Sequence, residues 1–204
     1  TDIKNKRINL NAQQLGDPQQ RAQQWQRQKP NPVFDPKEVQ TMVDHGIQRL
    51  LAMQVSDGGW GWFSGDGERS SPHTTAYVVH GLQLAKQNGI NNADAALQRG
   101  ITWLANHQAE RLKFIKAGER AKPIEKRTAN DLDAFIYMVW SDADKVSDDM
   151  RNYLYRDRKA LSVYAKSMLG LALTKQNQPA QLKMLLDNIE QYLVEDAENE
   201  TAYL

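Results

Sequence analysis

The sequence predicts an all-α protein built from repeated helical hairpins, and three observations support this fold class. Apolar residues recur at helical spacing in most segments after residue 36, whereas the alternation typical of β-strands is essentially absent. Short sequence patterns recur along the chain. A turn rich in glycine and tryptophan, Gln54–Phe63, follows the first strong helix and packs three glycines and three aromatics into its last six residues.

Two pairs of segments resemble each other within the chain. Gly46–Gln54 matches Gly100–Gln108 at its glycine, isoleucine, leucine and glutamine, and His80–Asn88 resembles Leu169–Asn177. Repetition over tens of residues is typical of solenoids and closed helical arrays, in which outer and inner helices alternate. The alternative is chance similarity between amphipathic helices.

Residues 1–36 differ in kind from the rest. Glutamine pairs, asparagine and basic residues dominate, three prolines close the stretch, and few residues could enter a core. Asp17 and Pro18 can still start a short helix that runs to Arg27. We expect residues 1–36 to form a polar linker or arm, and residues 37–204 to form the helical domain.

The helices of that domain are predicted from their caps and apolar stripes. Asp35 and Pro36 start the first helix, which runs to Gln54 with one apolar face. Ser71 and Pro72 start the second, which Asn88-Gly89 ends, and its wide apolar surface predicts an inner, more enclosed position. Asn92 is expected to cap the third, whose pattern weakens after Gln108. Four further helices are expected from about Ala129, Ser147, Ser162 and Pro179.

The turn Gln54–Phe63 is the most informative stretch of the chain. Its glycines allow positive φ and close backbone approach, and its aromatics are costly to leave in water. We therefore expect a rigid turn whose aromatics are tucked between neighbouring helices. The residues assigned this structural role are Gln54, Asp57, Gly58, Gly59, Trp60, Gly61, Trp62 and Phe63.

Composition excludes several kinds of chemistry. The chain has 204 residues, a net charge of +1 and no cysteine. The absence of cysteine excludes disulfides, thiolate zinc sites, a catalytic thiol and an internal thioester within this span. The near-zero net charge gives no reason to expect nucleic acid or an anionic membrane as a partner. No signal peptide or membrane-spanning segment is visible, and the chain starts without methionine, so we expect an excised piece of a larger protein.

The remaining candidates for chemistry have plainer structural interpretations. Asp131-Leu132-Asp133 lacks the last carboxylate of a terpenoid-cyclase acid motif, and acids also favour helix starts. The four histidines, including His73 and His80 two turns apart, are expected to be structural or exposed. Ser71, His73 and Asp66 lack the glycine elbow of a nucleophile, and Asp57, Asp66 and Glu68 fit no EF-hand spacing. We interpret the basic run as a solvated loop; it comprises Lys113, Lys116, Arg120, Lys122, Lys126 and Arg127. No catalytic residue, metal ligand or cofactor is expected.

The Gln-x-x-Asp-Gly-Gly-Trp-Gly pattern of residues 54–61 resembles the aromatic-glycine repeat of the α/α-toroid superfamily, which includes terpenoid cyclases, protein prenyltransferases and the thioester-containing domain of complement and alpha-2-macroglobulin proteins. The sharper resemblance is to the last. Three consecutive segments carry it: Gly-Ile-Gln-Arg-Leu-Leu (46–51), Asp-Gly-Gly-Trp-Gly-Trp-Phe (57–63) and Ser-Pro-His-Thr-Thr-Ala-Tyr-Val-Val (71–79). The match is specific over residues 37–108, and the doubled Gly-Trp turn looks like the bacterial branch.

The resemblance implies an incomplete α/α toroid from a large bacterial alpha-2-macroglobulin-like protein. The family's Cys-Gly-Glu-Gln-type thioester would lie before residue 1 or be missing. Such a protein would be periplasmic or secreted and would entrap proteases after bait cleavage. Its partners would be proteases, through the parent protein, and other domains of the same chain, with a membrane reached only through an anchor outside this span. The alternatives are a toroid enzyme of the terpenoid cyclase or prenyltransferase type and a helical-repeat scaffold that binds peptides.

Overall fold

The structure, a computed structural model, describes residues 35–63, 67–196 and 201–203. The chain divides into two compact units, residues 1–46 and 47–204. Of the first unit, residues 35–46 are described, and from Pro36 they form the first turns of α3 (Pro36–Ala52). The short helix expected from Asp17 lies outside the described residues.

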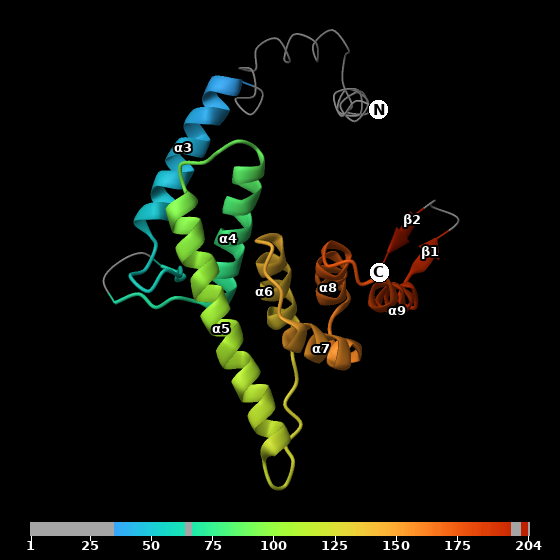
Figure 1. Ribbon diagram of the computed structural model, residues 1–204. Coiled ribbons are helices and arrows are strands. Elements are labelled where there is room, and N and C mark those ends of the chain that lie inside the picture. Colours follow the sequence, from blue (N-terminus) through green and yellow to red (C-terminus); the bar gives the residue numbers. More distant parts are fainter. Residues whose placement is uncertain (1–34, 64–66, 197–200, 204) are drawn as a thin grey trace. The chain divides into compact units, whose positions relative to one another are not determined.

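The second unit contains the end of α3 and six further helices among the described residues (Figure 1). They are α4 (Pro72–Gln87), α5 (Asp94–Arg120), α6 (Asp131–Asp142), α7 (Asp148–Asp157), α8 (Val163–Lys175) and α9 (Pro179–Glu190). A 3-10 turn, Arg158–Ala160, joins α7 to α8. The all-α fold class predicted from the sequence is confirmed. None of the described helices is both long and apolar enough to cross a bilayer.

Side-chain caps set where most helices begin. Ser71, Ser147 and Ser162 each accept a hydrogen bond from the backbone three residues ahead, at the starts of α4, α7 and α8. Asn130 and Asp133 form a capping box at the start of α6. The expected cap at Asn92 is wrong: α5 begins at Asp94, and Ala93 occupies the cap position without a side-chain bond. The Asp94 carboxylate instead favours the helix start through the helix dipole.

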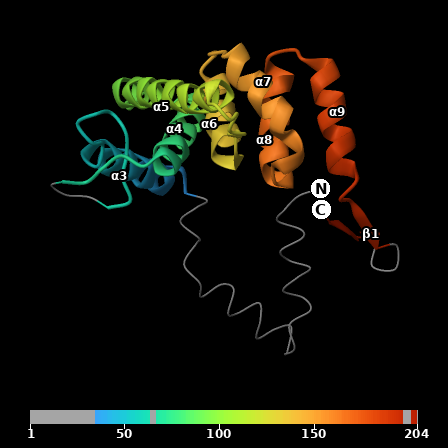
Figure 2. The same cartoon turned by 90° about the horizontal axis from the view of Figure 1, so that it is seen from below.

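The helices of the second unit alternate between more and less enclosed positions. α6 packs between α4 and α8, α5 contacts both α4 and α6, and α9 packs on α8, as Figure 2 also shows. Every residue of α6 from Asp133 to Val139 is buried, and α8 has almost no polar face. The prediction that α4 is more enclosed than α3 is confirmed, since α4 has five buried residues and α3 has Ile47 alone.

Two features differ from the sequence expectations. The helix expected to weaken after Gln108 continues to Arg120, because Ile115 and Gly118 are buried against the elements that follow. A two-stranded antiparallel sheet pairs β1 (Val194–Asp196) with β2 (Thr201–Tyr203). Three residues in each strand are too few to show a recognisable alternation.

Candidate functional site: the Gly-Trp clasp

The turn after α3 is closed by backbone hydrogen bonds. Val55 N–H donates to the Gly59 carbonyl and Gly58 N–H donates to the Val55 carbonyl, both at 2.9 Å. Gly58 has φ of +95°, and a Cβ there would lie 3.1 Å from the backbone oxygen of Arg99 on α5. Glycine is required at this position both for its left-handed backbone and for the close approach of the next helix.

Gln54 and Asp57 tie this turn to α5. The Gln54 side chain donates to the carbonyls of Gly58 and Ala96, each at 2.9 Å, and accepts from the Arg99 guanidinium. One Asp57 carboxylate oxygen accepts from Gly59 N–H at 3.0 Å and from the Ser70 hydroxyl at 2.6 Å, and the other accepts from Trp103 Nε1 at 2.9 Å. Partial burial raises the pKa of Asp57, but these hydrogen bonds outweigh it and hold the pKa below its ordinary value.

Trp60 ties the same turn to α4 and back to α3. Its side chain is 1% exposed, and its Nε1 donates to the Leu50 carbonyl at 2.8 Å. Its backbone N–H donates to the hydroxyl of Thr75 on α4 at 2.9 Å, and Thr75 donates back to the Trp60 carbonyl at 3.2 Å. Gly100 on α5 leaves room for the indole, since a Cβ there would lie 2.7 Å from Trp60 Cζ3.

We call this set the Gly-Trp clasp, and it comprises Gln54, Asp57, Gly58, Trp60, Thr75, Arg99, Gly100 and Trp103. The turn residues of the clasp were singled out from the sequence, whereas Thr75, Arg99 and Trp103 were not assigned to it. A threonine on the apolar face of a helix was the available signal for Thr75. Gly100 is aligned with Gly46 in the internal repeat, but this alignment did not indicate that Gly100 contacts Trp60.

The expectation that all three aromatics of the turn are tucked between helices is wrong for two of them. Trp62 is 69% exposed and Phe63 is 76% exposed. Glu68 accepts from Trp62 N–H at 2.9 Å, and its side chain occupies the space beside Gly61. The chain bends at Trp62 and Phe63, so these two side chains stay exposed while Trp60 is buried among the helices. The Trp62 ring stacks on His73 with centroids 6.2 Å apart.

The acidic pair on α6 is committed to structure. Asp133 is buried, receives a bidentate contact from Arg111 at 2.9 and 2.8 Å, and accepts from Asn130 N–H at 3.0 Å. Asp131 accepts from Ser162 N–H at 3.0 Å, at the start of α8. These carboxylates cap helices and neutralise a cation, so neither is placed to protonate a substrate, in line with the helix-start interpretation.

The histidines are dispersed. His45 is exposed on α3, His73 stacks on Trp62, and His80 Nδ1 lies 3.7 Å from an Asp142 carboxylate oxygen. His107 stacks on Trp103 with centroids 5.6 Å apart, and burial lowers its pKa despite the opposing field of Asp133. Among the described residues, no three histidine or acidic side chains gather as a metal-binding group.

The serine-based candidate reduces to a helix cap. The Ser71 hydroxyl accepts from Thr74 N–H at 3.4 Å and so caps α4. Asp66, which belonged to both this set and the calcium hypothesis, lies outside the described residues. Asp57, the first member of the calcium set, already has both carboxylate oxygens engaged by Ser70, Gly59 and Trp103.

The clasp therefore joins the end of α3, the start of α4 and the first part of α5 through hydrogen bonds of its polar side chains. Successive helices packed against one another and joined by a glycine-tryptophan turn are the architecture expected of an α/α toroid. The sequence model of the A-macroglobulin TED domain family matches residues 19–203. The chain belongs to this family.

A curated relative supports the same assignment. The alpha-2-macroglobulin of Thermotoga maritima is 30% identical over 135 residues, which is 64% of this chain and 8% of that relative. The part of the chain that matches thus covers less than a tenth of that relative's length.

Proposed function

We propose that this chain is a non-catalytic domain of an alpha-2-macroglobulin-like protease inhibitor that entraps proteases at the cell envelope, in the periplasm or outside the cell. The match to the TED domain over residues 19–203 carries this proposal. The name of the Thermotoga maritima relative supports it. The polar groups of the clasp support a domain without enzymatic activity, since each is used in holding helices together.

Within such an inhibitor, the eight turn residues of Gln54–Phe63 named above act as a structural motif. The clasp makes the end of α3, α4 and α5 one rigid body, because Gln54 and Asp57 bond to α5 while Trp60 bonds to both α3 and α4. A rigid body can pack against other domains of the inhibitor and move as a whole when a protease cuts the bait. Since the chain has no cysteine, no residue of this span captures the protease covalently through a thioester.

The experiment uses the complete natural chain that carries this sequence, incubated with an active protease. Residual activity is measured on a large protein substrate and on a small peptide substrate. Entrapment blocks the first and spares the second, because the enclosed protease keeps an open active site. A protease inactivated beforehand is the control, since it cannot cut the bait and stays free on gel filtration. Equal loss of both activities, or no loss of either, contradicts the proposal.

We also keep the domain division 1–36 and 37–204 as a proposal. A linker or arm is cut by proteases before a packed helical domain. Limited proteolysis is expected to release a resistant product that begins near residue 37. Cleavage that starts within α4 to α8 would contradict this division.

A further inference from the structure

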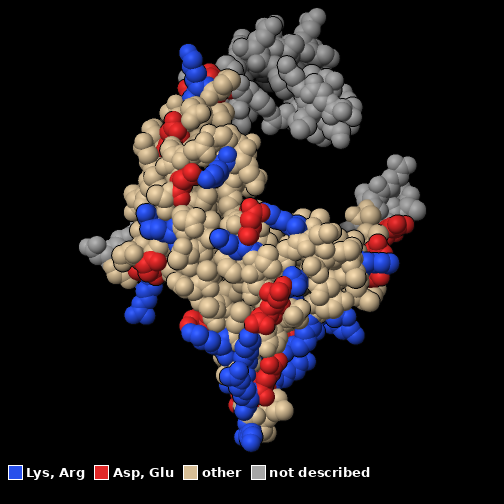
Figure 3. All heavy atoms as spheres, viewed as in Figure 1, with Lys and Arg blue, Asp and Glu red and all other residues tan. Residues whose placement is uncertain are grey.

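The end of α5 and the loop that joins it to α6 project from the other helices and carry a concentration of positive charge (Figures 1 and 3). Residues 110–127 hold seven cationic and three acidic side chains, a balance of +4 in a chain whose net charge is +1. The rest of the chain is therefore slightly acidic. The cations of this basic tip are Arg111, Lys113, Lys116, Arg120, Lys122, Lys126 and Arg127.

The acidic residues of the basic tip are already neutralised. Glu110 pairs with Lys113 at 2.7 Å, Glu119 with Arg156 at 2.7 Å, and Glu125 with Arg127 at 2.6 Å. Three exposed cations of the tip have no carboxylate within 4.0 Å in the described part of the chain: Arg120, Lys122 and Lys126. Positive potential at the tip is thus available to an outside partner.

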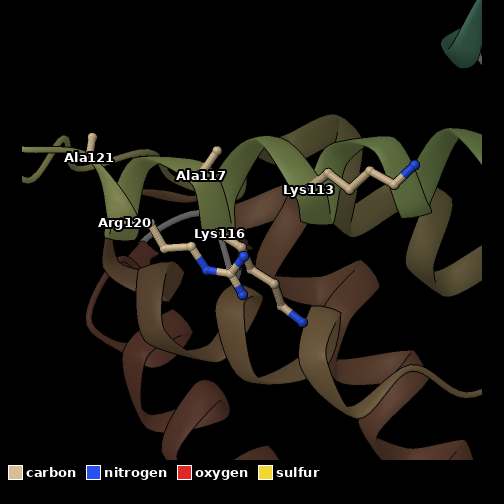
Figure 4. A pocket seen from close by; sticks show the side chains of 5 residues that line it. All are labelled: Lys113, Lys116, Ala117, Arg120 and Ala121. Carbon is tan, nitrogen blue, oxygen red and sulfur yellow. The ribbon is translucent and has the colours of Figure 1, made fainter.

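A hollow on the α5 side of the tip is lined by cations. Its volume is about 490 Å³, and Lys113, Lys116, Ala117, Arg120 and Ala121 line it. Figure 4 shows Lys116 and Arg120 extending to the same side of α5, while Lys113 runs along the helix away from them. Lys116 also contacts Asp149 at 2.6 Å, an exposed pair of the kind that contributes little and exchanges readily. Lysine and arginine together in such a hollow suit a phosphate group.

The loop adds an apolar side chain that a soluble polyanion would not need. Ile124 is 77% exposed and lies between Lys122 and Lys126 in the sequence. An apolar residue flanked by lysines is the arrangement of interfacial membrane anchors. The apolar group enters the boundary between headgroups and acyl chains, while the lysine stems reach back to the phosphates. Ile124 therefore favours a lipid surface over a nucleic acid or a free polyanion.

We propose that the basic tip docks onto the surface of a bilayer that contains anionic phospholipids. A headgroup phosphate occupies the hollow beside Lys116 and Arg120, and Ile124 inserts at the interface. The near-zero net charge of the whole chain did not indicate a membrane contact, because it sums a basic tip and a slightly acidic remainder. The inference does not depend on protease entrapment and can hold or fail separately from it.

The test measures binding of the chain to vesicles of phosphatidylcholine alone and of phosphatidylcholine with about a third phosphatidylglycerol. Binding to the anionic vesicles only, weakening as salt rises, is the expected result. The variant R120Q/K122Q/K126Q should bind about a hundredfold more weakly, since each lysine or arginine near such a surface contributes roughly fivefold. Ile124→Ser should weaken vesicle binding about fivefold and leave binding to soluble polyphosphate unchanged.

The matched control, K37Q/K145Q/K183Q, removes the same charge from exposed lysines on α3, on the loop before α7 and on α9. Circular dichroism establishes that all variants fold. The proposal is overturned if the chain ignores anionic vesicles or if the control loses as much affinity as the tip variant. It is also overturned if Ile124→Ser binds vesicles as well as the unaltered chain does, which would assign the tip to a soluble polyanion. Competition by millimolar inorganic phosphate would point to a free phosphate site and would likewise overturn it.

Discussion

Replacing Trp60 with alanine removes the bulkiest of the fully buried side chains among the described residues. An indole in this setting buries roughly 200 Å², and at about 25 cal/mol per Å² its transfer from water is worth about 5 kcal/mol. Alanine keeps part of that burial. The expected loss is therefore about 3 to 5 kcal/mol in the free energy of unfolding, the range typical of aromatic-to-alanine changes in cores.

Urea denaturation followed by circular dichroism measures this loss. With a slope of about 2 kcal/mol per molar urea, the midpoint should fall by about 2 M while the slope stays constant. Trp60→Phe separates the two contributions of the indole. It keeps most of the apolar burial but deprives the Leu50 carbonyl of its donor, and should cost about 1 to 2 kcal/mol.

Trp62→Ala is the matched control, because it removes the same side chain two residues further along the turn. Trp62 is 69% exposed and its main contact is the stack on His73, so the expected cost is below about 1 kcal/mol. If Trp60→Ala costs no more than Trp62→Ala, the clasp does not hold the helices and the reasoning from burial fails.

Three further substitutions test the packing and electrostatics around the clasp. Gly100→Ala should lower the free energy of unfolding in urea by about 1 to 3 kcal/mol, because the new Cβ would lie 2.6 Å from a methyl group on α4. Its control is Gly81→Ala on α4, where the new Cβ meets nothing within 4 Å and should stabilise the protein slightly. Equal effects of the two substitutions would contradict this. Asp57 has a lowered pKa when folded, so its stabilisation is complete above its unfolded pKa and is lost as pH falls through the folded pKa. The difference in unfolding free energy between wild type and Asp57→Asn should thus shrink below about pH 4, and a constant difference down to pH 2 would count against it. Arg111→Met leaves the buried Asp133 carboxylate without its cation and should lower the free energy of unfolding, measured thermally or in urea, by about 3 kcal/mol. Lys113→Met removes an exposed pair on the same helix and should lower it by only about 0.5 kcal/mol. Similar losses would contradict the role of burial.

The starts of most helices could be predicted because the signals are local. Ser71, Ser147 and Ser162 cap the helices that follow them, and Pro72 and Pro179 sit at the first helical positions, where proline is well tolerated. A cap depends on three or four neighbouring residues, so one sequence is enough to recognise it. The last turns of α5 were missed because Ile115 is buried by the helices that follow and Gly118 by the loop residues Glu125 and Arg127, contacts that the local pattern does not reveal.

Which of the three aromatic side chains in the turn is buried could not be predicted from the sequence. Trp60, Trp62 and Phe63 have the same propensity for burial, and their exposure is decided by which side the helices occupy. The internal repeat shows the same limit. Leu82 on α4 is 3% exposed, while Leu171, its counterpart on α8, is 62% exposed. Recurrence of a sequence pattern indicates a recurring helix but not the face that it buries, since that face depends on the neighbours of each copy.

Acidic residues hold the helices together while several basic residues stay exposed at the tip, and this difference links the fold to the proposed membrane contact. Asp157, which is 6% exposed, accepts from Ala129 N–H at 2.9 Å and pairs with Arg156 at 2.8 Å, much as Asp57 and Asp133 serve the clasp and α6. Carboxylates suit this role because a single group accepts several backbone and side-chain hydrogen bonds. Carboxylates that are engaged in these bonds cannot neutralise cations elsewhere. A nearly neutral chain can therefore present a strongly basic tip, and partner chemistry has to be inferred from the charges that the fold leaves free.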